Sequence, residues 1–315
     1  MFPVIDISKW FYEDIFVSGS KEKRWYRTPE ENQLRLFKLP VSLTSGTNPE
    51  GESTGEMWAE KIASEVGNTV GLETHQVDIG YLHVDPLVLE HYGLSHEFLG
   101  TGIYGALCKS FLNEGEEVLI EGADMIMDFD VTYDRKKLRG NTEIYRYDLL
   151  NRLFNKHGFE SKLHEMILLD AILGNTDRHQ DNFGIIRNER NKEIRMAPIY
   201  DNSSSLGREL PVERIKQLLS SQEMFDSYIR RSKTLIKIGS IDNIKKVSCI
   251  DLLGHALEQK PQIKNLIQKL EQLTDEDTNN IVQNVPDEVM SEVQKEFVSR
   301  ILRTRRDIIL REFLL

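Results

Sequence analysis

The stretch NTDRHQDN, residues 175–182, joins two segments of the chain whose residue patterns differ. Before it, ESKLHEMILLDAILG at 160–174 carries apolar residues at helical spacing over one wide face, which predicts a buried helix. After it, FGIIR at 183–187 and EIRMAPIY at 193–200 flank a turn-forming NERNK, which predicts a β-hairpin. We therefore expect the polar stretch to be a loop held between a buried helix and a hairpin.

Within this loop Asp177 precedes Asn182 by five residues. Phosphoryl transfer from ATP needs a carboxylate that orients and deprotonates the acceptor hydroxyl, and oxygen ligands for Mg²⁺. Protein kinases place their catalytic Asp and metal-binding Asn at this same spacing. We therefore expect Asp177 to be the catalytic base and Asn182 a metal ligand. The alternative is a polar loop with an Asx turn; the flanking residues favour the catalytic interpretation, namely Gly174, Asn175, Arg178 and His179.

Two further residues follow in the order that a kinase requires. Asp201 ends the predicted hairpin, in APIYDN at 197–202, and a hairpin that returns to the loop brings it back as a second Mg²⁺ ligand. Lys38 lies among apolar residues in LRLFKLP at 34–40, a predicted strand, and is expected to hold the phosphates. Taken alone, Asp201 would be a turn residue and Lys38 a solvent-facing lysine, so their order along the chain carries the argument.

The segment EMWAEKIASEVG at 56–67 predicts a helix after the lysine strand, with Gly67 as its C-cap. Glu56 or Glu60 on this helix is expected to pair with Lys38, and we include Glu56 among the residues of the nucleotide site. Further strands are expected near 74–84 and 104–112, and the chain beyond about residue 120 is mostly helical in pattern.

A phosphate-binding loop is expected at SGSKEK, residues 18–23, ahead of the lysine strand. Its glycine and short side chains let backbone N–H groups approach a phosphate, and we assign nucleotide binding to Ser18, Gly19, Ser20, Lys21 and Lys23. One of the two serines is also expected to be autophosphorylated, which would repel ATP and switch activity off. The P-loop-like Gly46-x-x-x-x-Gly51 is rejected, because Glu52 replaces the phosphate-binding lysine.

His179 lacks further histidine, cysteine or carboxylate partners at zinc-binding spacing. We expect it to make hydrogen bonds within the loop, and we include it among the residues that surround the nucleotide.

The motif Asn175-Thr176-Asp177-Arg178-His179-x-x-Asn182, followed by Ala197-Pro198-x-Tyr200-Asp201, is similar to that of the HipA-like serine/threonine kinases of bacteria. The segments 18–23 and 37–40 resemble the phosphate loop and the lysine strand of that family. The resemblance implies an α+β, protein-kinase-like two-lobed fold, with a small β-rich N-lobe at 1–115 and a larger helical C-lobe at 116–315. It also implies ATP and Mg²⁺ as cofactors.

The resemblance further implies a protein substrate and a toxin role in a toxin–antitoxin pair, with a DNA-binding antitoxin protein as partner. Family members phosphorylate aminoacyl-tRNA synthetases, so a protein of this kind or a translation factor is a candidate substrate. In HipA a sizeable subdomain precedes the phosphate loop, whereas only residues 1–17 precede it here. The antitoxin contact is therefore left open.

Composition excludes several other classes. The 315 residues are 39% hydrophobic and 29% charged, as in a globular protein, and a formal net charge of −11 argues against direct nucleic-acid binding. Cys108 and Cys249 are too few for a disulfide framework, and the N-terminus does not resemble a signal peptide. No apolar stretch approaches the ~20 residues that span a bilayer. A cytoplasmic protein without membrane attachment is expected.

Two alternatives remain open. Phosphoinositide kinases also carry an Asp-Arg-His-x-x-Asn loop, so a lipid or small-molecule kinase is the second hypothesis. A non-catalytic, kinase-shaped binding module is the third, although such proteins typically lose the lysine, the catalytic Asp or the metal-binding Asp, and all three have candidates here.

Overall fold

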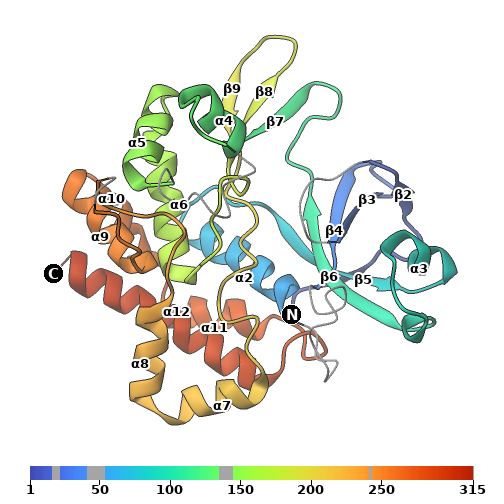
Figure 1. Cartoon of the computed structure of the whole chain (residues 1–315). Coiled ribbons are helices and arrows are strands. Elements are labelled where there is room, and N and C mark those ends of the chain that lie inside the picture. The colour runs from blue at the N-terminus through green and yellow to red at the C-terminus, as the bar shows by residue number, and fades with distance from the viewer. Residues whose placement is uncertain (16–21, 41–53, 135–144, 241–242, 315) are drawn as a thin grey trace.

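The computed structural model describes residues 1–15, 22–40, 54–134, 145–240 and 243–314. The N-terminal part forms a six-stranded sheet in the order β1-β5-β6-β4-β3-β2 (Figure 1). Neighbouring strands are antiparallel except for β1 and β5, which are parallel. The strands are β1 (Val4–Asp6), β2 (Phe11–Glu13), β3 (Lys23–Arg27), β4 (Leu34–Lys38), β5 (Val77–His83) and β6 (Gly102–Lys109).

This sheet is covered on both faces. Because successive side chains of a strand point to opposite faces, Leu36 of β4 packs with helix α2 (Glu56–Thr69), whereas Phe37 packs with helix α3 (Pro86–Tyr92). A short 3₁₀ helix, η1 (His96–Phe98), follows α3. Lys38 is on the same face of β4 as Leu36 and therefore faces α2, which places it on the side where the remainder of the chain lies.

The rest of the chain is mostly helical, with a second sheet in the order β7-β8-β9 (Figure 1). Helix α6 packs against α5, α9 and α12, and α11 packs against both α12 and α2. One hydrophobic core runs through α2, the sheet face beneath it and these helices. The elements are β7 (Glu117–Glu121), α4 (Gly122–Phe129), α5 (Tyr147–Lys156), α6 (Glu160–Leu173), β8 (Gly184–Asn188), β9 (Ile194–Met196), α7 (Val212–Ser220), α8 (Gln222–Arg231), α9 (Cys249–Gln259), α10 (Ile263–Ile267), η3 (Gln268–Gln272), α11 (Asp275–Gln283) and α12 (Glu292–Phe313).

Local sequence signals correspond to most of these elements. The helix expected at 160–174 is α6, and Gly174 ends it in the left-handed conformation at φ 69°. The hairpin expected after the polar loop is β8 and β9. Thr274 begins α11 with a capping box to Asp277.

The expected role of Gly67 is wrong. Helix α2 continues through Gly67 to Thr69. A Cβ atom at Gly67 would lie 2.2 Å from Cγ2 of Thr74. The glycine is therefore needed for the close approach of the following segment to the helix, and it does not end the helix.

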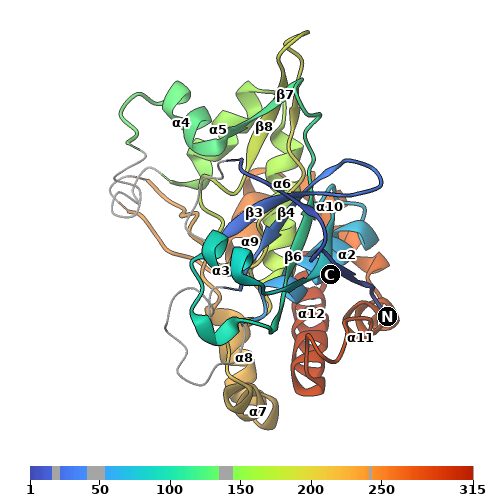
Figure 2. The ribbon, with the colours of Figure 1, turned by 90° about the vertical axis from the view of Figure 1, so that its right-hand side faces the viewer.

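Cys108 and Cys249 are free thiols, and both are buried. Among the described residues, the helices are all too short or too polar to cross a lipid bilayer. In the view of Figure 2, turned by a right angle, α11 and α12 lie beneath the six-stranded sheet and α2.

Candidate active site

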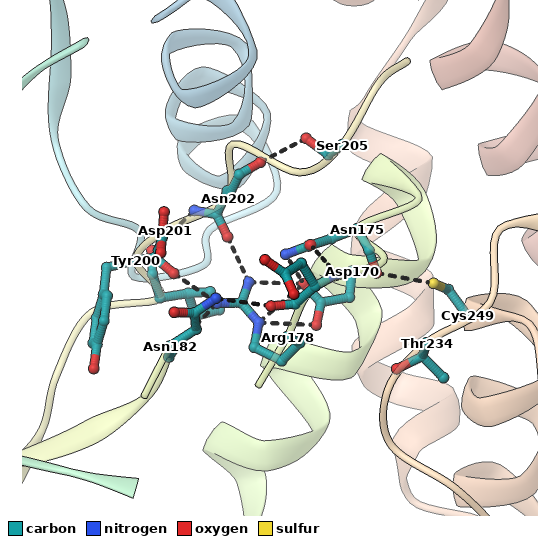
Figure 3. Close-up of polar contacts among 12 residues, drawn as sticks. Asp170, Asn175, Arg178, Asn182, Tyr200, Asp201, Asn202, Ser205, Thr234 and Cys249 are labelled. Carbon is teal, nitrogen blue, oxygen red and sulfur yellow. Dashed lines mark hydrogen bonds and ion pairs between the residues drawn. The ribbon is translucent and has the colours of Figure 1, made fainter. Parts of the chain in front are cut away.

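The loop between α6 and β8 is organised by one buried arginine. Arg178 is fully buried and forms an ion pair of 2.7 Å with Asp170 of α6 (Figure 3). Its Nη1 also donates hydrogen bonds to the carbonyl oxygens of Asn182 (2.8 Å) and Tyr200 (2.6 Å). Its Nη2 reaches Oδ1 of Asn202 at 2.6 Å. A single guanidinium thus joins the end of α6, the polar loop and the segment after β9.

Asp170 stabilises the charged form of Arg178. Burial by itself lowers the pKa of this guanidinium, but the charge of Asp170 and the hydrogen bonds to it raise the pKa above its usual value. Burial raises the pKa of the Asp170 carboxyl, and the charge of Arg178 opposes that rise. The ion pair joins α6 to the loop. It fixes the backbone at both predicted metal ligands, since Arg178 contacts Asn182 directly and the residues on either side of Asp201.

Asp177 lies in the irregular part of this loop and is half-buried. Its backbone N–H donates to Oδ1 of Asn175 at 3.1 Å, so the Asx turn that was the alternative interpretation is present. Its carbonyl oxygen accepts a hydrogen bond of 2.8 Å from Nδ2 of Asn182. Within the described part of the chain, the Asp177 carboxylate makes no hydrogen bond or ion pair. The backbone at Asp177 is held by hydrogen bonds on both of its sides, while the carboxylate is left for an acceptor.

Lys38 lies between two carboxylates, from α2 and from the segment after β9. Its Nζ is 3.0 Å from Oε1 of Glu60 and 3.5 Å from Oδ1 of Asp201. Burial lowers the pKa of this buried amine, but the charges of Glu60 and Asp201 outweigh that effect and raise its pKa well above the usual value. Glu60 Oε2 also accepts a hydrogen bond of 3.1 Å from the backbone N–H of Asn202. The sheet, α2 and the segment carrying Asp201 therefore meet at Lys38.

Glu56 has a partner other than Lys38. The sequence left open which glutamate of α2 pairs with Lys38, and the structure pairs it with Glu60. Glu56 lies one turn earlier on the helix and forms an ion pair with Arg208. Because residues four apart share a face of a helix, both glutamates point toward the chain that follows Asp201, but only Glu60 is beside the lysine.

The predicted metal ligands suit Mg²⁺ better than a metal held by protein alone. Arg178 ties the backbone of Asn182 to that of Tyr200, which is next to Asp201. Because Nδ2 of Asn182 donates a hydrogen bond within its own loop, the side-chain oxygen Oδ1 is the atom of Asn182 that is left for a metal ion. Over the described ranges, no group of three or more His, Cys, Asp and Glu residues is arranged to hold a metal ion. Mg²⁺ is commonly held by one or two protein ligands together with substrate phosphates and water. The donor set therefore fits a magnesium–nucleotide.

Asp201 has a left-handed backbone conformation, with φ of 54°. A non-glycine residue pays an energetic penalty there and keeps the conformation only where its surroundings impose it. Here the surroundings are Lys38, Glu60 and Arg178, which contact Asp201 or its two neighbours.

The remaining predicted residues are placed as follows. His179 is half-buried, and its Nδ1 accepts a hydrogen bond of 3.2 Å from the backbone N–H of Asp181, within the loop. Ser18, Gly19, Ser20 and Lys21 lie outside the described residues, so the phosphate loop and its autophosphorylation stay predictions. Lys23 begins β3 directly opposite Lys38 of β4. The predicted loop therefore precedes a strand that adjoins the lysine.

Sequence reasoning missed His75, which links three parts of this site. Its Nε2–H donates to the carbonyl oxygen of Lys109 at 2.7 Å, and its backbone N–H donates to Ile199 at 3.0 Å. Its ring lies edge-on to Phe111, which in turn contacts the ring of Tyr200. Burial, together with the charge of Lys38, lowers the pKa of His75 to about 4. An isolated histidine between two predicted strands carries no sequence signal for this role.

Asp170 and Arg208 were also missed. Asp170 had a usable signal, because it interrupts an otherwise apolar helical face in LLDAIL, and a buried charge needs a partner. Arg208 had none, because its partner Glu56 is far away in the sequence.

The site combines a strand lysine paired with a helix glutamate, a loop with Asp and Asn five residues apart, and a second Asp after a hairpin. This combination is the architecture of a protein-kinase-like phosphotransferase. Comparison with known proteins supports this class. No protein-family model matches the chain. The serine/threonine-protein kinase CtkA of Helicobacter pylori is 24% identical over 299 residues, which are 93% of this chain and 81% of that protein.

The crystal structure of the Helicobacter pylori proinflammatory kinase CtkA superposes with a TM-score of 0.71 at 19% identity, over 97% of this chain and 94% of that one. Shewanella oneidensis HipA, solved with HipB and operator DNA, gives 0.48 at 14% identity, over 94% and 65% of the two chains. The chain is thus a homologue of a serine/threonine kinase and has a kinase-like α+β fold, which confirms the predicted fold and the predicted kinase relationship.

Proposed function

We propose that this protein is an ATP-dependent serine/threonine protein kinase that transfers the γ-phosphate of ATP to a protein hydroxyl. The observation that carries the proposal is the position of Lys38, which bridges Glu60 and Asp201 from two distant parts of the chain. Pseudokinases typically lack the lysine, the catalytic Asp or the metal-binding Asp, whereas this site has both the Lys38 bridge and a carboxylate at Asp177. The homology to a serine/threonine-protein kinase supports the choice of acceptor.

Each residue has a defined task in the proposed reaction. Lys38 remains protonated and neutralises phosphate charge, and Asn182 and Asp201 would hold the metal ion. When bound, Mg²⁺ supplies further charge neutralisation on the phosphates. Asp177 orients the acceptor hydroxyl and accepts its proton as the acceptor oxygen bonds to the γ-phosphorus and the bond to ADP breaks.

The resemblance of the catalytic loop to HipA-like kinases supports a finer proposal. The substrate is then a protein of translation, such as an aminoacyl-tRNA synthetase or a translation factor, and an antitoxin protein restrains the enzyme. We also place the lobe boundary near residue 115, because the first sheet ends at Lys109 and β7 begins at Glu117.

The test is a phosphotransfer assay with radiolabelled ATP and Mg²⁺, followed by phosphoproteomics of cells that express the wild type or Asp177→Ala. The proposal expects phosphoserine or phosphothreonine that depends on Asp177, and mass spectrometry of peptide 17–24 reports autophosphorylation in the same samples. Equal phosphorylation in both proteins, or label on a lipid or a small molecule instead, would refute it.

A further inference from the structure

The segment from Asp201 to Arg208 is bonded to α2 at both of its ends. At its start, the backbone N–H of Asn202 donates to Glu60 at 3.1 Å, and Lys38 bridges Glu60 and Asp201. At its end, Arg208 forms its ion pair with Glu56, and the carbonyl oxygen of Arg208 accepts a hydrogen bond of 3.1 Å from Gly55. Two glutamates one helical turn apart therefore hold the two ends of one short segment.

The two attachments are connected through the segment itself. The backbone N–H of Arg208 donates to the carbonyl oxygen of Ser205 at 3.2 Å. The Ser205 hydroxyl donates to the carbonyl oxygen of Asn202 at 2.6 Å (Figure 3). A chain of contacts thus runs from Glu56 through Arg208, Ser205 and Asn202 to Glu60.

The conformation held in this way is a costly one. Asp201 and Leu206 both have left-handed backbone conformations, with φ of 54° and 58°. Such positions persist only where contacts over-determine them. On the side of α6 and the polar loop, the segment is fixed by backbone hydrogen bonds from Leu206 to Leu173 (3.1 Å) and from Thr176 to Ser204 (3.1 Å). On its other side, the segment is held by the contacts with α2.

Of the contacts between the segment and α2, the Arg208–Glu56 ion pair is expected to contribute most. The side chain of Arg208 is 14% exposed and that of Glu56 is 3% exposed, so solvent screens the pair weakly. Removing Arg208 takes its counter-charge away from a carboxylate that is 3% exposed, and hydration of that carboxylate requires the surrounding chain to open. In this molecule the chain that would open is the one that carries Asp201.

We propose that Arg208 is a positioning residue of this active site, which through Glu56 holds the 201–208 segment against α2 and so fixes the metal-binding carboxylate of Asp201. Arg208 touches neither nucleotide nor acceptor in this role. The effect on metal binding rests on the proposed function, whereas the effect on the segment does not.

The experiment has two readouts on the purified full chain. Hydrogen–deuterium exchange, without ligand, reports the protection of the amides of Asn202 and Leu206. Calorimetry with ADP, in the presence and absence of Mg²⁺, reports the metal-dependent part of nucleotide binding. The variants are Arg208→Gln, Arg208→Lys and the charge exchange Glu56→Arg with Arg208→Glu.

Lys260→Gln is the matched control, because Lys260 forms an ion pair of 2.6 Å with Glu160 at the opposite end of α6 from the catalytic loop. Arg208→Gln should raise exchange in the segment about tenfold and weaken Mg-ADP binding about tenfold, the size expected for a lost charged hydrogen bond. ADP binding without Mg²⁺ should not change. Arg208→Lys and the charge exchange should recover part of both effects, and Lys260→Gln should show neither.

Unchanged exchange in Arg208→Gln overturns the proposal, as does equal weakening of ADP binding with and without Mg²⁺. Failure of the charge exchange to recover either readout would also overturn it. If Arg208→Gln does not fold, Arg208→Lys is compared with Lys260→Gln by the same criteria. If the wild type binds no Mg-ADP, the proposed function is rejected, and the exchange result alone decides whether Arg208 holds the segment.

Discussion

Arg178 and Asp170 form an ion pair that is buried directly beneath the candidate catalytic loop, with Nη2 and Oδ1 2.7 Å apart. The pair joins α6 to the loop, and the same guanidinium continues to the backbone at Asn182 and Tyr200. The geometry of the site therefore depends on a contact that is buried away from solvent.

Asp170→Asn should reduce the free energy of unfolding by about 3–5 kcal/mol, because it leaves the Arg178 guanidinium buried without its counter-charge. Urea unfolding at pH 7 measures this loss. Glu165→Gln, on the same helix and partly exposed, is the control and should change stability by less than about 1 kcal/mol. A loss as small as that of the control would show that the pair is not needed for folding.

Asp177→Ala should reduce phosphotransfer by about 10²–10⁴-fold, the range expected for loss of a general base. Mg-nucleotide binding should be retained, because the Asp177 side chain makes no contact that holds the loop within the described structure. Single-turnover kinetics and calorimetry separate the two effects. Asp181→Asn, in the same loop, should keep turnover within a few-fold of wild type. More than a few per cent of wild-type turnover in a folded Asp177→Ala protein would remove this residue from the role of base.

Asp201→Asn should weaken Mg-dependent nucleotide binding more than Asn182→Ala does. A carboxylate is a stronger ligand than an amide for a hard cation, and Asp201 also contacts Lys38. Calorimetric titration with Mg-ATP measures both variants. Unchanged affinity and turnover in the two of them would mean that the metal binds elsewhere.

Glu60→Gln should make the activity more sensitive to alkaline pH. Burial lowers the pKa of Lys38, and without Glu60 only Asp201 is left among its two neighbouring carboxylates to oppose that effect. The amine would then lose its proton as the pH rises, and the phosphates would lose their cation. The ratio of Glu60→Gln to wild-type turnover should therefore fall between pH 7 and pH 9. Lys38→Met, which has no cation at any pH, should have low activity throughout, and a flat ratio for Glu60→Gln would contradict the account.

His75 should make stability depend on mildly acidic pH. Its pKa is lowered from 6.5 to about 4 in the folded protein, so the unfolded chain binds more protons between these values. The stability that its neutral form provides is complete above pH 6.5 and is lost as the pH falls toward 4. Wild type should therefore lose about 2 kcal/mol more than His75→Asn between pH 7.5 and pH 5 in urea unfolding. Equal losses would show that His75 titrates normally.

Much of the site was predictable because its signals are local. The Asp177–Asn182 spacing, the amphipathic pattern of α6 and the hairpin around 188–192 each lie within a short window of sequence. Lys38 was predictable because it interrupts a short apolar strand. These features reflect periodicity and turn chemistry, which depend on neighbouring residues alone.

The rest depends on contacts between distant segments. Helical periodicity could not choose between Glu56 and Glu60, because both lie on one face of α2, and the choice is made by where β4 and Arg208 lie in space. The parallel pairing of β1 with β5 joins residues more than seventy positions apart, and three residues are too few to show a period. The function of Gly67 depends on the path by which the chain turns back at Thr74, and a residue pattern does not give that path.

Helix α2 follows the lysine strand in sequence, yet nearly all of its length is buried between the first sheet and the helices of the second lobe, α11 among them. A cut between the lobes would leave the apolar residues of α2 facing water on one side, and it would separate Glu56 and Glu60 from Arg208 and Asn202. The two lobes therefore share one hydrophobic core. The helix that carries Glu56 and Glu60 also fills that core, so a substitution on its apolar face would disturb both the stability of the protein and the position of these two glutamates.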